Sequence, residues 1–461
     1  MMTNRQNSAN IIEITYRYVD SYLIYLAMRL GIFSNERRTF TIKSLQEELA
    51  SKHQTTFNED YLKRILRSLC THSLLNELTG VYTQTELGSY LNNEAAQSGI
   101  AREFSDERWV RISQLSAADL IAGKNIYEEL FLQDDYILNL PQQLISMIKG
   151  YQQVKMLQIA GELKLFDLMS DEPTLISDIA KACDITDEQA HYLLSYLAKM
   201  NIVRQHSTNG VNLKTLGKLM RSDTSNMTAF VLHESKEKWL ALAKIFTMLQ
   251  TGEDAFKQAN HLLIFDYLKL QPALANIFHD AMTAVSTSIE IPAIVEGIEF
   301  SGTVMDMGGG QGQLLKAILL RHPQTSGIIF DLPEVIEKVV VTQDISQRCR
   351  LHSGSFFASK SIPTADTIIL KRVLHDWDDE KSETILRHCQ LSLTKKGRVL
   401  IIEYLADSPM MAKADLMMMA IGGKGRSTED FQRLSANAGL FFSRKVALTP
   451  MLSMIELSNT K

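Results

Sequence analysis

Residues 302–312 read GTVMDMGGGQG, and this stretch decides the fold class of the C-terminal part of the chain. An apolar run typical of a buried β-strand leads into the spaced glycines Gly308, Gly310 and Gly312. Glycine lets the backbone turn sharply and approach a ligand closely, as nucleotide-type ligands at strand ends require. The stretch therefore predicts a strand, a ligand-binding loop and the start of a helix.

Segments that predict strands alternate with segments that predict helices around this loop. Apolar runs at residues 327–332, 366–371 and 398–405 are typical of strands buried on both faces. Amphipathic stretches at 314–322, 334–341 and 382–393 lie between them and predict helices. We therefore expect a Rossmann-like, doubly wound α/β domain over residues 299–461.

Two acidic residues narrow the ligand that the loop could bind. A dinucleotide fingerprint would carry a further glycine, but Gln313 and Leu315 occupy the candidate positions, and Asp306 is an added acid. Asp331 follows the loop by the interval at which an acid accepts hydrogen bonds from ribose hydroxyls, although it could also cap the next helix. The pattern favours an adenosyl ligand without a pyrophosphate.

The segment 369–380, ILKRVLHDWDDE, places His375 just past a buried strand. Ligands of doubly wound folds lie at that edge of the sheet, where a histidine can act as a general base. The structural alternative is a histidine that only packs. A metal site is not favoured, because His375 is the one nitrogen ligand in the segment and no EF-hand spacing is present.

An internal repeat occupies the N-terminal two thirds of the chain. Leu30 and Phe33 correspond to Leu163 and Phe166, and Trp109 corresponds to Trp239. Further matched pairs are Leu66 and Leu194, Leu69 and Leu197, Leu87 and Leu216, Gly88 and Gly217, and Gly123 and Gly252. Each copy predicts three short helices and a strand pair, at 78–83 or 203–213, which is the pattern of a winged helix. We expect a flexible end at 1–15, an extra winged-helix-type copy at 16–150 and a second copy with linking helices at 151–298.

The winged-helix pattern raises the question of DNA binding. In the second copy the helix that would read the major groove begins DITDEQA and continues apolar, the reverse of a phosphate-contacting surface. The first copy carries Lys63, Arg64 and Arg67, but also Glu59 and Asp60. The net charge of −5 gives no overall attraction to nucleic acid. A packing or dimerisation role is therefore the preferred interpretation.

Cysteine usage and hydropathy bear on the compartment. The four cysteines form no CxxC pair, which argues against a disulfide framework or a zinc cluster. The N-terminus lacks the features of a secretory leader, and no stretch approaches the ~18 apolar residues that span a bilayer. We therefore expect a cytoplasmic protein with no membrane contact.

Four motifs, in order, carry a family resemblance: DMGGGQG, FDLPEVIE, LKRVLHDWDDE and GRVLIIEYLADSP. Together with AFKQANHLLIFDYL, ALANIFHDAMTAVS and GGKGRSTEDFQRLSANAGL, they make residues 150–461 resemble the plant and bacterial small-molecule O-methyltransferases related to caffeate and hydroxyindole O-methyltransferases. The resemblance implies a winged-helix dimerisation domain, a metal-free methyltransferase domain and S-adenosyl-L-methionine as cofactor.

The resemblance also implies roles for single residues. His375 matches the base that removes a proton from a substrate hydroxyl, and Glu403 matches the carboxylate that orients it. The expected cofactor contacts are Asp306, Gly308, Gly310, Gly312, Asp331, Leu332, Ser355, Phe356 and Lys371. The expected acceptor contacts are Phe278, Met282, Asp376 and Met418, although without the resemblance the run Met417–Met419 would indicate plain core packing.

Three features depart from the family pattern. Ser355 stands where an acid is common, Gly425 stands where a second glutamate usually supports the histidine, and an extra N-terminal copy precedes the usual one. The extra copy could imitate the partner subunit of a homodimer, add to a true dimer, or serve another protein.

We therefore expect an enzyme that methylates a hydroxyl of a small aromatic or polyketide-like metabolite. One alternative is a catalytically lapsed cofactor-binding regulator whose winged helices contact protein or DNA. Another is a relative that performs N-methylation or a rearrangement.

Overall fold

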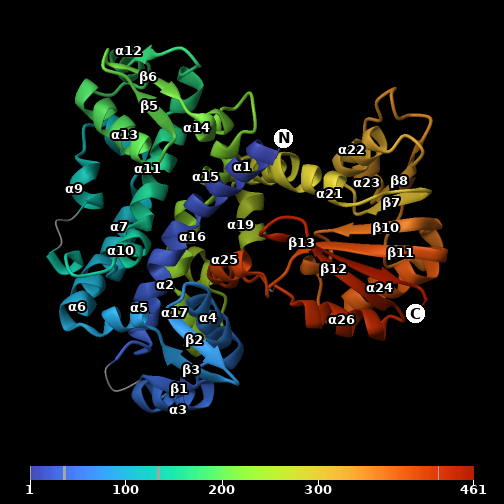
Figure 1. The fold of residues 1–461 in the computed structure, drawn as a ribbon, viewed down its shortest axis with the longest axis horizontal. Helices are drawn as coiled ribbons and strands as arrows, with labels where there is room; N and C mark the ends of the chain where they lie inside the picture. Colours follow the sequence, from blue (N-terminus) through green and yellow to red (C-terminus); the bar gives the residue numbers. More distant parts are fainter. Residues whose placement is uncertain (1, 35–37, 132–134, 424, 461) are drawn as a thin grey trace. The chain divides into compact units, whose positions relative to one another are not determined.

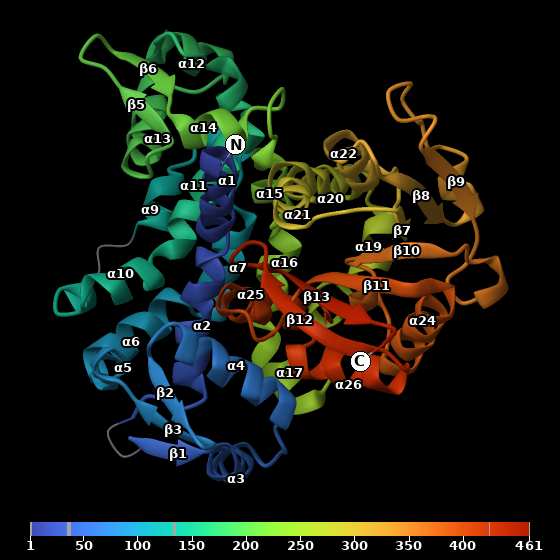
Figure 2. The same cartoon turned by 45° about the vertical axis from the view of Figure 1, so that its right-hand side comes forward.

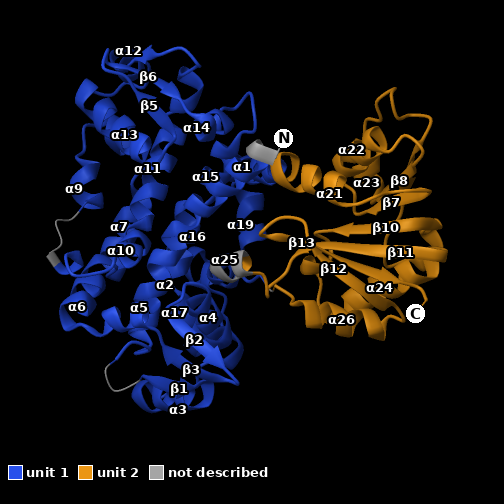
Figure 3. Cartoon of the chain, viewed as in Figure 1, with its two compact units in different colours: residues 1–285, 412–423 blue, residues 286–411, 424–461 orange. Residues whose placement is uncertain are grey.

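The computed structural model describes residues 2–34, 38–131, 135–423 and 425–460 (Figure 1). The chain forms two compact units, one of residues 1–285 with 412–423 and one of residues 286–411 with 424–461 (Figure 3). The first unit is mainly helical, with two small sheets among its described residues, and the second is built on one large sheet.

The first copy of the repeat lies in the first unit after an N-terminal helix. Its small sheet is antiparallel in the order β1-β3-β2. The elements are α1 (Met2–Thr15), α2 (Arg17–Arg29), β1 (Thr39–Thr41), α3 (Ile42–His53), α4 (Glu59–Thr71), β2 (Leu75–Leu78), β3 (Val81–Gln84), α5 (Glu86–Ser89), η1 (Tyr90–Asn92), α6 (Glu94–Glu103), α7 (Asp106–Gln114), α8 (Ala117–Ile121), α9 (Ile126–Leu130), η2 (Asp135–Ile137) and α10 (Gln142–Ile148).

The second copy repeats this order, with an antiparallel sheet in the equivalent order β4-β6-β5. The elements are α11 (Gly150–Glu162), η3 (Leu165–Leu168), β4 (Thr174–Leu175), α12 (Ile176–Ala182), α13 (Asp187–Lys199), β5 (Val203–Gln205), β6 (Gly210–Leu213), α14 (Thr215–Met220), α15 (Met227–His233), α16 (Lys236–Ala243), α17 (Ile245–Thr251), α18 (Ala255–Asn260), α19 (Ile264–Leu270) and α20 (Pro272–Val285). The two small sheets lie at opposite ends of the first unit (Figures 1 and 2).

Equivalent side chains shape both copies. Asn58 and Thr186 cap the helices α4 and α13 by accepting backbone N–H groups of Tyr61 and Gln189. Of the matched residues, Leu30, Phe33 and Phe166 are buried and Leu163 is partly buried. The winged-helix-type repeat expected from the sequence is thus present.

Two local expectations differ from the structure. Residues 2–15 form helix α1 instead of a flexible end, because Ile11 and Ile12 are buried against α14 and α15. The first strand pair begins at Leu75, three residues before the expected start, since the turn lies at Thr79 and Gly80, both with positive φ.

The two copies meet through a cluster of buried aromatic side chains. The rings of the matched residues Trp109 and Trp239 stack with centroids 5.0 Å apart, and Trp109 Nε1 donates a hydrogen bond to the Trp239 carbonyl. Tyr18 stacks on Trp239 at 4.5 Å and Tyr22 lies against Trp109 at 5.2 Å. Helix α2 packs against its counterpart α11 beside this cluster. Such aromatic contacts add to the stabilisation from buried area.

The copies also exchange equivalent polar contacts. Tyr18, on α2 of the first copy, donates to Glu234 Oε2 of the second copy at 2.5 Å. Its counterpart Tyr151, on α11, donates to Glu103 Oε1 of the first copy at 2.7 Å. Both glutamates are fully buried and each accepts from a lysine, Lys238 or Lys149. This reciprocity is the hallmark of an isologous interface, here formed within one chain.

The second unit contains a seven-stranded sheet, counted over its described residues, in the order β12-β13-β11-β10-β7-β8-β9. Strands β7 to β11 are parallel, and β13 pairs antiparallel with both β11 and β12. The elements are η4 (Ser286–Glu290), α21 (Ile291–Gly297), β7 (Thr303–Met307), α22 (Gln313–Arg321), β8 (Ser326–Asp331), α23 (Pro333–Ile336), β9 (Cys349–Ser353), η5 (Ser359–Ser361), β10 (Ala365–Lys371), η6 (Leu374–Asp376), α24 (Asp379–Ser392), β11 (Leu393–Tyr404), α25 (Pro409–Ala420), α26 (Thr428–Asn437), β12 (Phe441–Ala447) and β13 (Leu452–Ser458), with most of α25 belonging to the first unit.

Alternate residues of the strands enter two cores, one on each face of the sheet. Met305 and Ile368 face α24 and α26, whereas Val304 and Ile369 face α21 and α22. The chain winds from β7 outward to β9 and then returns to β10 on the other side of β7. In doubly wound sheets this reversal creates the crevice where ligands bind. The expected α/β domain is confirmed.

Glu234→Ala should lower the free energy of unfolding of the first unit by about 3–5 kcal/mol, because Lys238 and the Tyr18 hydroxyl lose a buried acceptor. Urea unfolding followed by tryptophan fluorescence measures this. Glu253→Ala is the control, since its ion pair with Lys257 is half exposed and should contribute less than ~0.5 kcal/mol. Equal effects of the two substitutions would contradict the assignment.

Candidate active site

The glycine loop after β7 is held to the end of β8. Gly308, Gly310 and Gly312 have φ values of 76°, 56° and 74°, a region that favours glycine. Gly308 N donates to the Phe330 carbonyl at 2.8 Å. A Cβ at Gly312 would lie 2.2 Å from Ile329 Cδ1, whereas one at Gly310 would meet no protein atom within 4 Å. The loop therefore faces open space at Gly310, where a ligand can approach the backbone.

Asp331, at the end of β8, is joined to this loop. Its Oδ2 accepts from Gly310 N at 2.8 Å, and its Oδ1 accepts from Leu332 N at 2.7 Å. Each carboxylate oxygen has a second lone pair that can accept from a ribose hydroxyl. The structure thus brings together the expected cofactor residues Gly310, Asp331 and the half-exposed Leu332.

A buried ionic cluster lies at the ends of β7 and β10. Burial raises the pKa of Asp306 to about 6, although the positive charge of Lys371 opposes the shift. Lys371 Nζ lies 2.5 Å from Glu290 Oε2, and Tyr404 and Arg372 also bond to Glu290. Burial opposes ionisation of Glu290, but Lys371 and then Arg372 outweigh it and hold its pKa below the usual value. Lys371 is therefore engaged by Glu290, a partner that the sequence prediction missed.

His375 lies on the short turn η6 that follows β10. Its Nδ1 is 3.1 Å from both oxygens of Glu403, which is on β11 and has a side chain only 4% exposed. Its Nε2 is 3.3 Å from Asp376 Oδ1, and the imidazole is one third exposed. The expected pair His375 and Glu403 is thus in contact. A carboxylate only accepts, so the contact with Glu403 favours a proton on Nδ1, while Nε2 is the ring nitrogen on the side of the half-exposed Asp376.

The turn that carries His375 is fixed by Arg426, which the sequence prediction did not single out. The guanidinium donates to the carbonyls of Leu374 and Trp377, at 2.5 and 2.6 Å, on the two sides of His375. It also pairs with Asp379 at 3.0 Å and has a side chain only 4% exposed. Arg426 follows Gly425, so the segment that lacks the second glutamate still contributes an anchor for the turn.

The expected adenine side is a short loop after β9. Ser355 Oγ accepts from Phe357 N within the loop. Phe356 is partly buried, and its ring lies edge-on to Trp377 at 5.7 Å. This loop offers an aromatic surface beside a hydroxyl, which fits an adenine ring without an acidic partner.

The expected acceptor residues fall in both units. Asp376, in the second unit, is half exposed. Phe278 and Met282 on α20 and Met418 on α25 belong to the first unit, and all three are partly buried. Phe278 borders a shallow, nearly filled hollow whose other lining residues are His233, Ser235, Lys238, Phe256, Ile264, Leu268 and Leu274.

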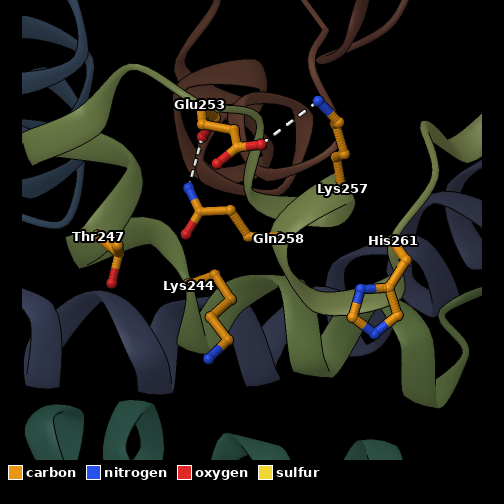
Figure 4. Close-up of a pocket in the computed structure, with 6 residues that line it drawn as sticks. All are labelled: Lys244, Thr247, Glu253, Lys257, Gln258 and His261. Carbon is orange, nitrogen blue, oxygen red and sulfur yellow. Dashed lines mark hydrogen bonds and ion pairs between the residues drawn. The ribbon is translucent and has the colours of Figure 1, made fainter.

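A second, more open hollow of about 730 Å³ lies on the first unit (Figure 4). Lys244, Thr247, Glu253, Lys257, Gln258 and His261 line it, and none of them was a predicted site residue. Lys257 pairs with Glu253, as the dashed line in Figure 4 marks. Among the described residues no cluster of His, Cys, Asp or Glu could hold a metal ion.

Asp306→Asn should stabilise the protein more at high than at low pH. Because the pKa of Asp306 is raised to about 6 in the folded chain, its contribution to stability is complete below about pH 4 and is lost as the pH rises through 6. The gain from the uncharged asparagine should be about 1 kcal/mol larger at pH 8 than at pH 5. Chemical denaturation at both pH values measures the difference, and equal gains would contradict it.

The chain is similar to known O-methyltransferases. A family model described as an O-methyltransferase domain matches residues 239–441. The phenazine O-methyltransferase PhzM of Lysobacter antibioticus is 30% identical over 325 residues, which are 68% of this chain and 94% of that protein. The O-demethylpuromycin-O-methyltransferase of Streptomyces alboniger is 31% identical over 332 residues, 68% of this chain and 88% of that protein.

Solved structures share the fold. The crystal structure of CalO1, a methyltransferase in calicheamicin biosynthesis bound to SAH, matches with a TM-score of 0.62 and 26% identity over 68% of this chain and 96% of that one.

None of the helices that the structure describes is long and apolar enough to cross a membrane. The matched relatives identify the chain as a member of the S-adenosylmethionine-dependent small-molecule O-methyltransferase family.

Proposed function

We propose that this enzyme methylates a phenolic hydroxyl of a small aromatic metabolite, with His375 as the general base. Relatives named for phenazine, demethylpuromycin and myricetin substrates support an acceptor of this size and chemistry. The observation that carries the proposal is the contact of His375 Nδ1 with both oxygens of the buried Glu403.

In this mechanism Glu403 fixes the tautomer of His375. With the proton held at Nδ1, Nε2 accepts the proton of the acceptor hydroxyl. The imidazolium that forms then lies between two carboxylates, because Asp376 Oδ1 is 3.3 Å from Nε2. Arg426 keeps the turn in place while the charge of His375 changes.

S-adenosylmethionine, when bound, supplies the methyl group from its sulfonium. In this proposal the backbone of Gly308, Gly310 and Gly312 lies against the cofactor. Asp331 accepts hydrogen bonds from it, and Phe356 packs on its adenine ring. Phe278, Met282 and Met418 are proposed to line the acceptor side, where flexible and aromatic side chains suit a flat ring. Of the run Met417–Met419, Met418 is the less buried residue, which supports its assignment to the pocket.

We further propose that the first copy, residues 16–150, takes the place of a partner subunit against residues 151–298, ahead of the methyltransferase domain at 299–461. The exchanged bonds Tyr18 to Glu234 and Tyr151 to Glu103 support this arrangement. The relatives match only about two thirds of this chain while being covered almost completely themselves, which leaves room for one added copy.

This arrangement does not favour DNA binding by the first copy. Arg64 is engaged in a buried ion pair, and Lys63 pairs with Glu59 on the surface of α4.

His375→Ala should reduce kcat by ~10²–10⁴-fold while the Kd for S-adenosylmethionine stays nearly unchanged, because the base acts in proton transfer and not in cofactor binding. The assay follows transfer of a labelled methyl group to a panel of phenols, including a hydroxyphenazine and a flavonol. Glu403→Gln should give a smaller loss of the same kind.

His206→Ala is the matched control, since His206 lies in the second copy and bonds to Asn212. A His375→Ala enzyme with the kcat of the wild type would contradict the role of His375 as general base. Cofactor binding without transfer to any acceptor in the panel would favour the lapsed regulator instead.

The full chain should behave as a monomer of about 52.0 kDa in sedimentation at micromolar concentration, because the face that would bind a second copy is already covered. A stable dimer of twice that mass would contradict the proposal that the first copy replaces a partner subunit.

A further inference from the structure

Arg64, in the first copy, binds a segment that lies some 350 residues further along the chain. On α4, its Nε donates to Asp415 Oδ2 at 2.8 Å and its Nη2 donates to Asp415 Oδ1 at 2.6 Å. Nη2 also reaches the carbonyls of Asp415 and Gly423, at 3.2 and 3.3 Å. Helices α4 and α25 lie side by side in both views (Figures 1 and 2). The guanidinium thus holds the segment 415–423 at its two ends.

The environment makes this contact specific. The Arg64 side chain is 11% exposed and that of Asp415 is 6% exposed. The planar fork of a guanidinium matches both oxygens of a carboxylate, which a lysine cannot do. Removing one partner of a buried pair leaves the other charge without compensation, so the contact resists displacement of α25.

The segment that Arg64 holds is tightly fitted around Met418. Met417 and Met419 are each 2% exposed and anchor the helix on either side of the half-buried Met418. A Cβ at Gly423 would lie 2.7 Å from Met418 Cε, and one at Gly422 would lie 2.4 Å from Asp254 Oδ2. The position of the Met418 side chain therefore depends on where the 415–423 backbone is held.

We propose that Arg64 is a positioning residue for the methyl acceptor, because it holds α25 where Met418 lines the acceptor pocket. The inference rests on the proposed function, in which Met418 contacts the acceptor. It assigns the extra copy a part in acceptor binding in addition to its packing role.

Arg64→Gln tests the proposal in the full-length chain. The KM for a phenol that the wild type methylates should rise and kcat/KM should fall by ~10–100-fold, as expected when a group is misplaced from a distance. The Kd for S-adenosylmethionine should not change. Lys63→Gln is the matched control, because Lys63 is the neighbouring residue and pairs with Glu59 where both side chains are 51% exposed.

Two further measurements separate positioning from loss of folding. Arg64→Gln combined with Asp415→Asn removes both charges, so the double variant should be no worse than the single one if the pair acts as a unit. Hydrogen exchange should accelerate in residues 412–423 of Arg64→Gln and stay unchanged at 303–331. Unchanged exchange in 412–423, or an unchanged KM in a folded Arg64→Gln protein, would overturn the proposal. If the wild type methylates no phenol, the proposed function fails, while the exchange result still decides whether Arg64 holds α25.

Discussion

The parallel pairing of β7, β8, β10 and β11 is the constraint on which the candidate site depends. Parallel strands end at the same edge of a sheet, so the glycine loop, Asp331, His375 and Glu403 are gathered there although they span about a hundred residues of sequence. The two cores of the second unit bury the strands on both faces of the sheet. Polar groups can therefore contact a ligand only at the edge where the strands end.

Much of this edge could be predicted from the sequence, for physical reasons. Strands buried on both faces are continuous apolar runs, and spaced glycines mark a place where the backbone can approach a ligand closely. The strand β7, the loop at Gly310 and the acid at Asp331 could therefore be predicted. The contact of His375 with Glu403 could be predicted only through the family resemblance, since His375 lies on a turn after β10 and Glu403 lies on β11, 28 residues later. Glu290 was missed because a lone acid at the end of a helical stretch carries no local signal; its partners Lys371 and Tyr404 become visible only in three dimensions.

The same argument explains where the N-terminal predictions succeeded and where they did not. Periodic leucines and matched tryptophans revealed the repeat, because each copy must bury the same face. The helical N-terminus was mispredicted because residues 2–15 have few apolar positions, and Ile11 and Ile12 become decisive only when α14 and α15 are there to cover them. Arg64 and Arg426 look like ordinary surface cations in sequence, yet their side chains are only 11% and 4% exposed, because each bonds to acceptors that are far away in the sequence.

The exchange of bonds between the two copies has a consequence for how this protein can vary. In a symmetric pair of identical subunits every substitution appears on both sides of the axis at once, so a change must suit two places. Here the two sides are encoded separately, and they already differ. Arg108 bonds to Tyr151 at the position that corresponds to Lys238 in the second copy. Glu234 accepts from Lys238 on α16, whereas Glu103 accepts from Lys149, which lies between α10 and α11. One copy can therefore acquire a contact that the other lacks, as the pair of Arg64 with Asp415 illustrates, while the bonds exchanged between the copies are kept.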